Sequence, residues 1–171
     1  TDGLFILSLV HCLMKAGRID LDYLARLTDA PCLVNGDEGS DEFGLILRDE
    51  AGKALVVDRR TGKPAAFDGK GVQPDLSGSW RHAGFTHRPV LHHMAERYLT
   101  DEYAPETIAE KVGIDAKRIR AIAADIARVA FDDAIELDRE WTDFRGETHK
   151  KMIGRPVAFH AMRGISAHSN G

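Results

Sequence analysis

The stretch that most constrains the fold is the last one, residues 154–171. A proline and a short apolar run over residues 157–162 precede a polar segment bounded by glycines. This change is typical of a buried strand that runs into an exposed loop. In open α/β sheets, ligands bind at loops beyond the carboxyl ends of the strands. We therefore expect an α/β fold with a ligand loop over residues 164–171. Because the chain ends on Asn170-Gly171 directly after this strand, we also expect it to be part of a larger protein.

Helical periodicity dominates both ends of the remaining chain. Apolar residues occur almost all round the first predicted helix, which Thr1 or Asp2 can cap and Gly17 can end. Near the other end, isoleucines recur at helical spacing after Asp115, a plausible N-cap. The predicted helices cover residues 1–16, 20–27, 90–98, 105–112 and 115–130, and short strands are predicted at 31–34 and 134–137.

The middle of the chain has a different character. Residues 35–84 hold more than half of the sixteen glycines, and turn formers separate three short apolar runs at 43–47, 54–57 and 65–67. This pattern indicates an irregular β-rich insertion, with a disordered linker as the alternative. The predicted organisation is therefore a helical start of the α/β domain (1–34), the β-rich insertion (35–87), and the helices and final strand and loop of the α/β domain (88–171).

Charge and cysteine content exclude several classes of protein. A net charge of −4 and a pI near 6.0 argue against a broad nucleic-acid surface, so no nucleic-acid partner is expected. The two cysteines, Cys12 and Cys32, lie in apolar surroundings without CxxC spacing, which favours buried free thiols. The apolar run over residues 4–14 is too short to span a bilayer.

Histidines are the most obvious candidates for chemistry, but their spacing in the sequence is not that of a zinc site with a cysteine or carboxylate partner. We predict that they are ordinary surface or capping histidines. The sequence also contains no Gly-x-Ser-x-Gly motif, P-loop or Rossmann glycine fingerprint. The histidines in question are His82, His87, His92, His93, His149, His160 and His168.

Four stretches support a more specific interpretation. They are the opening Thr-Asp-Gly, the run AGRIDLDYLARLTDAPCLV, the run YAPETIAEKVGIDAKRIRAIAADIARV and the final GISAHSNG. In this order they resemble the molybdopterin oxidoreductases of the dimethyl-sulfoxide-reductase superfamily, as an internal fragment of the large catalytic subunit. Ala167 stands where that family usually has glutamine. The form Ala-Pro-Cys-Leu-Val is similar to members that act on sulfur-containing or other oxyanion substrates.

The resemblance implies a Rossmann-like molybdopterin-binding domain, with helices around a partly parallel sheet. It also implies the cofactor molybdenum bis(molybdopterin guanine dinucleotide), which supports two-electron or oxygen-atom transfer. Thr1 and Asp2 would then contribute to a guanine site, with a simple helix cap as the alternative. The end loop would contact pterin and diphosphate, with a plain polar turn as the alternative; its implied contacts are Gly164, Ser166, His168, Ser169, Asn170 and Gly171. No catalytic residue and no protein ligand to a metal is assigned within this chain.

The resemblance also implies partners and further parts. A [4Fe–4S] cluster is expected in a missing amino-terminal part. The expected complex contains an iron–sulfur subunit for electron transfer, together with a membrane anchor. The chain alone should be inactive, and the compartment stays open between periplasm and cytoplasm. Two alternatives remain. One is a cofactor-free scaffold or binding module of the same fold within an electron-transfer complex, and the other is a small hydrolase or metal-binding protein built on the histidines.

Overall fold

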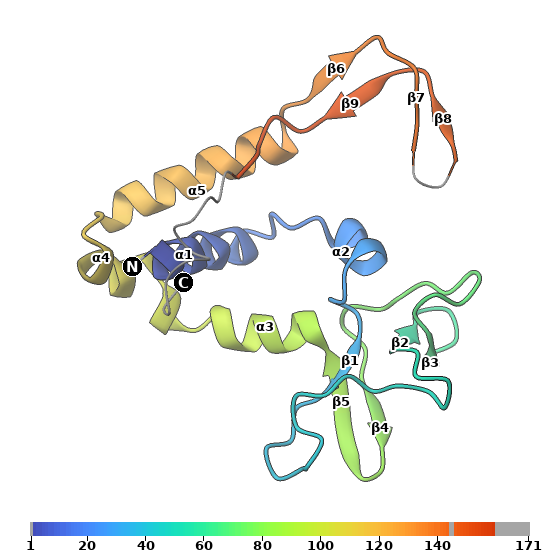
Figure 1. Ribbon diagram of the computed structural model, residues 1–171. Helices are drawn as coiled ribbons and strands as arrows, with labels where there is room; N and C mark the ends of the chain where they lie inside the picture. Colours follow the sequence, from blue (N-terminus) through green and yellow to red (C-terminus); the bar gives the residue numbers. More distant parts are fainter. Residues whose placement is uncertain (1, 144–145, 160–171) are drawn as a thin grey trace. The chain divides into compact units, whose positions relative to one another are not determined.

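The computed structural model describes residues 2–143 and 146–159 (Figure 1). The chain forms two compact units. The first combines Thr1–Arg18 with Tyr98–Gly171, and the second is Ile19–Arg97. Each unit has its own helices and its own antiparallel strands, so the two are described separately.

In the described part of the first unit there are three α-helices and one short 3-10 helix, whose ends follow local capping rules. Pro105 occupies the first turn of α4, and Gly113 ends it with a φ of 71°. The side chain of Asp115 caps α5 by accepting a hydrogen bond of 2.7 Å from the backbone N–H of Lys117. The helices are α1 (Asp2–Lys15), η1 (Asp101–Tyr103), α4 (Pro105–Val112) and α5 (Ala116–Phe131).

The core of this unit lies where α1 packs against α4 and α5. Leu9 of α1 contacts Ile119 and Ala123 of α5, and all three are buried. Half-buried apolar residues surround them, among them Phe5 and Cys12. His11 is also buried, and its Nδ1 donates to the Tyr98 carbonyl oxygen at 2.8 Å. Burial of one face of each helix against the others is therefore what stabilises this bundle.

Two nested antiparallel hairpins follow α5. The outer pair is β6 (Ile135–Leu137) with β9 (Met152–Gly154), and the inner pair is β7 (Trp141–Thr142) with β8 (Thr148–His149). Figure 1 shows them as one extended arm beyond the end of α5. Ile135, Leu137 and Ile153 remain half or more exposed, so the described residues cover neither face of the outer pair.

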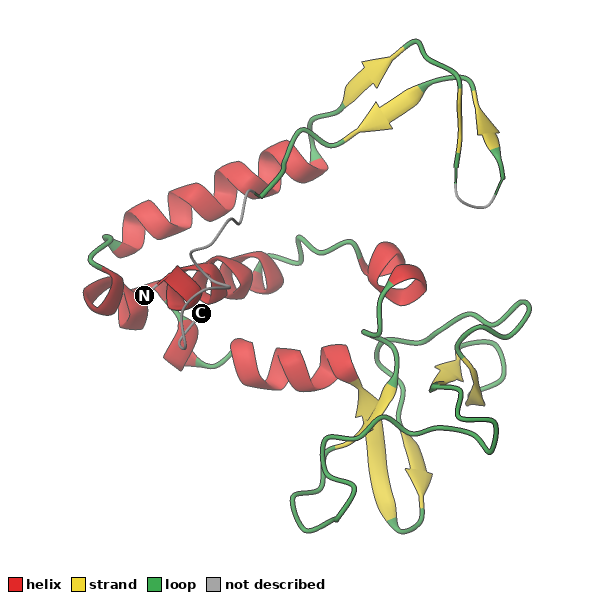
Figure 2. Cartoon of the chain, in the orientation of Figure 1, coloured by secondary structure: helices red, strands yellow, loops and turns green. Residues whose placement is uncertain are grey.

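The second unit is a small mixed α/β fold (Figure 2). A three-stranded antiparallel sheet has the order β1-β5-β4, and β2 and β3 form a separate antiparallel hairpin. Leu33 and Val56 are fully buried, and the buried carboxylate of Asp58 accepts hydrogen bonds from the backbone N–H groups of Arg60 and Gln73. The elements are α2 (Leu21–Leu27), β1 (Leu33–Asn35), β2 (Leu55–Asp58), β3 (Lys63–Ala66), β4 (Trp80–His82), β5 (Phe85–Pro89) and α3 (Val90–Tyr98).

The predicted α/β class is confirmed, whereas the predicted partly parallel, Rossmann-like sheet is wrong for the described part of the chain. All of the strand ladders found there are antiparallel. Residues 155–159 of the predicted final strand region contain no strand, and the rest of that strand lies outside the described residues. The domain boundaries at 34/35 and 87/88 stay predictions. Among the described helices, none has the length and apolar character needed to cross a membrane.

Candidate functional site

Of the residues that the sequence assigns to cofactor binding, the structure describes Asp2 alone. Asp2 is the first residue of α1, and its side chain is exposed. No hydrogen bond or ion pair to another described residue engages its carboxylate. The other assigned residues lie outside the described residues: Thr1, Gly164, Ser166, His168, Ser169, Asn170 and Gly171.

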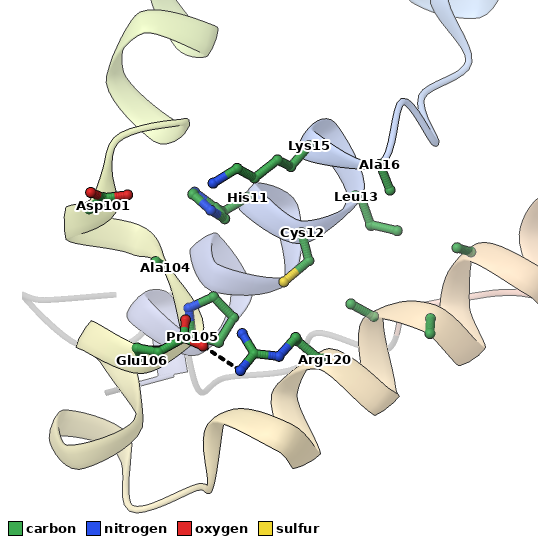
Figure 3. A pocket seen from close by; sticks show the side chains of 13 residues that line it. His11, Cys12, Leu13, Lys15, Ala16, Asp101, Ala104, Pro105, Glu106 and Arg120 are labelled. Carbon is green, nitrogen blue, oxygen red and sulfur yellow. Dashed lines mark ion pairs between the residues drawn. The ribbon is translucent and has the colours of Figure 1, made fainter.

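The first unit contains a cavity of about 590 Å³ between α1, the start of α4 and α5 (Figure 3). His11, Cys12 and Lys15 of α1 line one side of it. The opposite side is formed by α4 and α5, which contribute Pro105, Glu106, Arg120, Ala123, Ala124 and Ala127. Alanine side chains reach only one carbon beyond the backbone, so this face of α5 leaves space that larger side chains would fill. The cavity thus follows from the alanine-rich sequence of α5.

Charges at this cavity are largely balanced. The Arg120 guanidinium forms an ion pair with the Glu106 carboxylate, which connects α5 with the first turn of α4 (Figure 3). The hydrogen bond from Arg120 lowers the pKa of Glu106, and the same bond raises the pKa of Arg120. Lys15 and Asp101 also line the cavity. Two cationic and two anionic side chains of the lining therefore offset one another, so this cavity has no strong preference for an anion.

The thiol and the imidazole of the cavity are not arranged as a reactive pair. Burial raises the pKa of Cys12, and the nearby Arg120 only partly opposes this. The thiol is therefore protonated at neutral pH, and the thiol is a much weaker nucleophile than the thiolate. Since a carbonyl oxygen can only accept, His11 must carry its proton on Nδ1 to bond Tyr98. The cavity suits a small molecule with an apolar body and a polar edge, and its own residues supply no evident nucleophilic chemistry.

The second unit has a polar basin of about 560 Å³ beside α3. Two of its charged residues take part in a network with His92: the Glu96 carboxylate lies 3.0 Å from His92 Nε2 and 3.3 Å from Arg88 Nη1. Arg88 Nη1 is also 2.7 Å from His92 Nε2. His93 lines the basin and lies 3.7 Å from the same carboxylate. His92 is thus engaged in this network, whereas Nε2 of His93 is buried and has no hydrogen-bond partner among the described residues. That both are ordinary surface or capping histidines stays a prediction.

One group of neighbouring side chains was not predicted from the sequence. Asp143, Glu147 and His149 at the tip of the inner hairpin present ligand atoms that all lie within 4.8 Å of one another. The sequence assigns no metal ligand, and that assignment stays a prediction; what the structure adds is that His149 has two carboxylates beside it. A detectable sign was present, because the alternation Trp141-x-Asp143 and Glu147-x-His149 places all four residues on one face of a hairpin.

Comparison with known proteins gives one informative relationship. No protein-family model matches the chain. The chain is 36% identical over 181 aligned residues to a sulfite dehydrogenase subunit of Allochromatium vinosum. The match covers the whole of this chain but 18% of the length of that relative. The relative's name describes it as one subunit of a sulfite dehydrogenase.

The comparisons contradict the family to which the sequence motifs assign the chain. The chain was expected to be an internal fragment of the large catalytic subunit of a molybdopterin oxidoreductase of the dimethyl-sulfoxide-reductase superfamily. No family model supports that assignment, and the relative that spans the chain is named as a sulfite dehydrogenase subunit. The absence of a parallel sheet among the described residues agrees with this correction.

Proposed function

We propose that this chain is part of a subunit of a sulfite dehydrogenase and serves the oxidation of sulfite or a closely related sulfur oxyanion. The observation that carries the proposal is 36% identity, along the entire chain, to the Allochromatium vinosum sulfite dehydrogenase subunit. Because the chain spans 18% of that relative, the complete activity would require residues beyond these 171. The relative's designation as a subunit supports the expectation of a multi-subunit complex.

The chemistry of this reaction defines what the complex must provide. Sulfite gains one oxygen atom from water to become sulfate, and two protons and two electrons leave. A two-electron acceptor is therefore needed, and we propose molybdenum bis(molybdopterin guanine dinucleotide) in this role. When bound, this group supplies two-electron and oxygen-atom transfer, while the protein supplies binding, orientation and electrostatics.

The described residue that fits such a cofactor is Asp2. A carboxylate can accept two parallel hydrogen bonds, and the N1–H and N2–H groups of guanine present two parallel donors. Asp2 is exposed at the start of α1, and no described residue engages its carboxylate. Thr1 and the polar residues from Gly164 to Gly171 remain proposed contacts to the rest of the cofactor.

The proposed complex has further components. The two electrons must leave the oxidised substrate, so we propose that the partner is an iron–sulfur subunit for electron transfer and that the complex has a membrane anchor. A [4Fe–4S] cluster in the complete protein is part of the same proposal. The substrate is a small anion. The cavity between α1, α4 and α5 is not proposed as its site, because the charges that line it are balanced.

The test is to express the complete reading frame and measure three quantities. They are molybdenum content, guanine nucleotide released by acid, and sulfite-dependent reduction of ferricyanide. In Asp2→Asn we expect guanine nucleotide content to fall about tenfold under limiting cofactor, since a hydrogen bond to a charged group contributes ~1.5–3 kcal/mol. Asp125→Asn, at an exposed position of α5, is the matched control.

The outcomes separate the parts of the proposal. A folded complete protein without molybdenum, guanine nucleotide or sulfite oxidation would contradict the proposed enzyme and favour the cofactor-free scaffold. Ala167, which replaces the glutamine of the resembled motif, is the residue that keeps this alternative open. A loaded, active protein in which Asp2→Asn and Asp125→Asn behave alike would remove the Asp2 contact and leave the rest of the proposal standing.

A further inference from the structure

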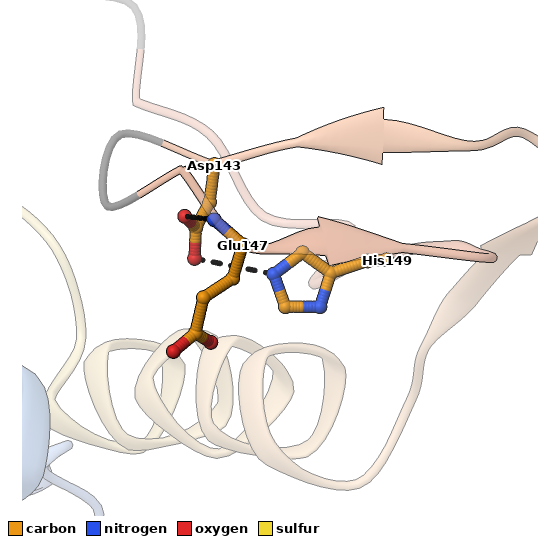
Figure 4. A group of neighbouring side chains, drawn as sticks. All are labelled: Asp143, Glu147 and His149. Carbon is orange, nitrogen blue, oxygen red and sulfur yellow. Dashed lines mark hydrogen bonds and ion pairs between the residues drawn. The ribbon is translucent and has the colours of Figure 1, made fainter.

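The tip of the arm brings three metal-ligating side chains to one face of a hairpin (Figure 4). Asp143 directly follows β7, Glu147 directly precedes β8, and His149 lies in β8. The register pairs Trp141 with His149 and Thr142 with Thr148. Side chains two residues apart point to the same face of a strand. The face that carries Trp141 and Asp143 on one strand therefore carries Glu147 and His149 on the other.

Backbone hydrogen bonds hold the two ends of the loop together. Asp143 N–H donates to the Glu147 carbonyl oxygen at 3.0 Å, and Glu147 N–H donates to Asp143 Oδ1 at 3.0 Å. Gly146 N–H donates to the Asp143 carbonyl oxygen, and Gly146 has a φ of 81°, which favours glycine. The second carboxylate oxygen, Asp143 Oδ2, lies 3.1 Å from His149 Nε2. One carboxylate thus serves both the loop backbone and the imidazole.

Trp141 fixes the orientation of the imidazole. Its indole stacks on the His149 ring with centroids 4.9 Å apart and an angle of 24° between the planes. Its own N–H donates to the Lys151 carbonyl oxygen at 3.0 Å. A side chain held on both sides loses little further freedom when it takes a ligand, which favours binding. The imidazole therefore presents Nε2 to the Asp143 carboxylate in a prepared direction.

We propose that Asp143, Glu147 and His149 form a binding site for one Zn²⁺ ion. In a tetrahedral site with zinc bonds of about 2.0–2.2 Å, neighbouring ligand atoms are about 3.3–3.5 Å apart. Asp143 Oδ2 and His149 Nε2, 3.1 Å apart, are already near that spacing. Glu147 is exposed, and its ligand oxygen lies within 4.8 Å of the ligand atoms of Asp143 and His149. Rotation of this exposed side chain can bring the carboxylate to the spacing that zinc requires. Three protein ligands leave the fourth position to water.

The ligand types select among metals. An imidazole nitrogen suits zinc and other late first-row divalent ions, whereas magnesium and calcium prefer sites made of oxygen ligands alone. No thiolate belongs to the group, which disfavours copper(I). Zinc bound here would connect the end of β7 to β8 across the loop. This site is independent of the proposed function, because the aspartate assigned to the cofactor lies at the start of α1.

The experiment uses the 171-residue chain, freed of metal with a chelator and titrated with ZnCl₂ in a buffer at about pH 7.5. Calorimetry should show one strong site in the micromolar range. A second readout reports location: in a Trp80→Phe background Trp141 is the remaining tryptophan, and Co²⁺ should quench its fluorescence. Added Zn²⁺ should restore that fluorescence.

Substitutions decide whether the proposed ligands hold the ion. His149→Ala and Glu147→Gln should each weaken Zn²⁺ binding at least about tenfold. Glu147→Gln leaves the Trp141 stack and the Asp143 hydrogen bonds in place, so it tests the ligand without disturbing the hairpin. Glu140→Gln, an exposed carboxylate of the same arm, should bind within about twofold of the parent chain.

Two results would overturn the proposal. One is binding too weak to saturate at about millimolar Zn²⁺, which would leave Asp143 and His149 as a simple hydrogen-bonded pair. The other is stoichiometric binding that His149→Ala and Glu147→Gln do not weaken, which would assign the ion to other histidines of the chain.

Discussion

Ile119→Ala is the substitution whose effect on the first unit follows most directly from the packing. Ile119 is fully buried in α5 and contacts Leu9 of α1, which is 4% exposed. Because α1 begins at Asp2, this contact also fixes the helix that carries the proposed guanine contact. The substitution removes three carbon atoms from the centre of the bundle, where nothing else replaces them.

The magnitude can be worked out from burial. Each buried carbon contributes about 0.8 kcal/mol to the free energy of unfolding, so three carbons account for about 2.4 kcal/mol. The cavity left behind adds a further cost, and measured losses for such changes are about 2–5 kcal/mol. The neighbouring cavity lined by Cys12 and Ala123 gives the helices room to relax. We therefore expect a loss of about 3 kcal/mol.

The assay is urea unfolding of the 171-residue chain, followed by far-UV circular dichroism. Ile153→Ala is the control, because this isoleucine of β9 is 62% exposed. Its loss should be below about 1 kcal/mol, since an exposed side chain gives up little burial. A loss below about 1 kcal/mol for Ile119→Ala, or equal losses for both variants, would refute the argument that this helix contact stabilises the unit.

Two further predictions concern the second unit. A Cβ added at Gly36 would clash with Cε1 of the His93 ring, so Gly36→Ala should destabilise the unit by about 1–2 kcal/mol. In a double-mutant cycle, combining Gly36→Ala with His93→Ala should recover most of that loss. Equal losses in both backgrounds would show that the clash is not the cause. Burial lowers the pKa of His87 below its ordinary 6.5 in the folded protein. As the pH falls, His87 is therefore protonated in the unfolded chain before it is protonated in the folded one. Its contribution to the free energy of unfolding is complete above about pH 6.5 and declines as the pH falls below that value. In His87→Gln the acid-side decline in the unfolding free energy should be shallower, and an unchanged pH profile would contradict the assignment.

Helix positions were predictable from the sequence because their determinants are local. Pro105, Gly113 and Asp115 mark the ends of α4 and the start of α5, and the structure places the helices between these residues. Most of the predicted strands were also found: the expected strands at 31–34 and 134–137 and the apolar runs at 54–57 and 65–67 overlap β1, β6, β2 and β3. The run over residues 43–47 lies beside β1, which it contacts through backbone hydrogen bonds and an isolated bridge between Ile46 and Val34, but it forms no regular strand.

For the candidate sites, too, the sequence predicted some features and missed others. The cofactor contacts were inferred from a resemblance that the comparisons correct, and of those residues the structure describes Asp2 alone. The cavity beside Cys12 was not predicted, because it depends on which face of α5 meets α1. The thiols were predictable: Cys12 and Cys32 are both free, and Cys32 is buried.

By itself, the sequence determined the helices, their caps and the α/β character of the chain, because hydrophobic periodicity and capping act within one or two turns. Only the tertiary structure decided the antiparallel pairing of the strands and the meeting of His149 with Asp143 and Glu147. Register and pairing arise from contacts between segments separated in sequence. The free energy of a strand pairing depends on how the side chains of the two strands pack against each other, and no local sequence pattern specifies that packing.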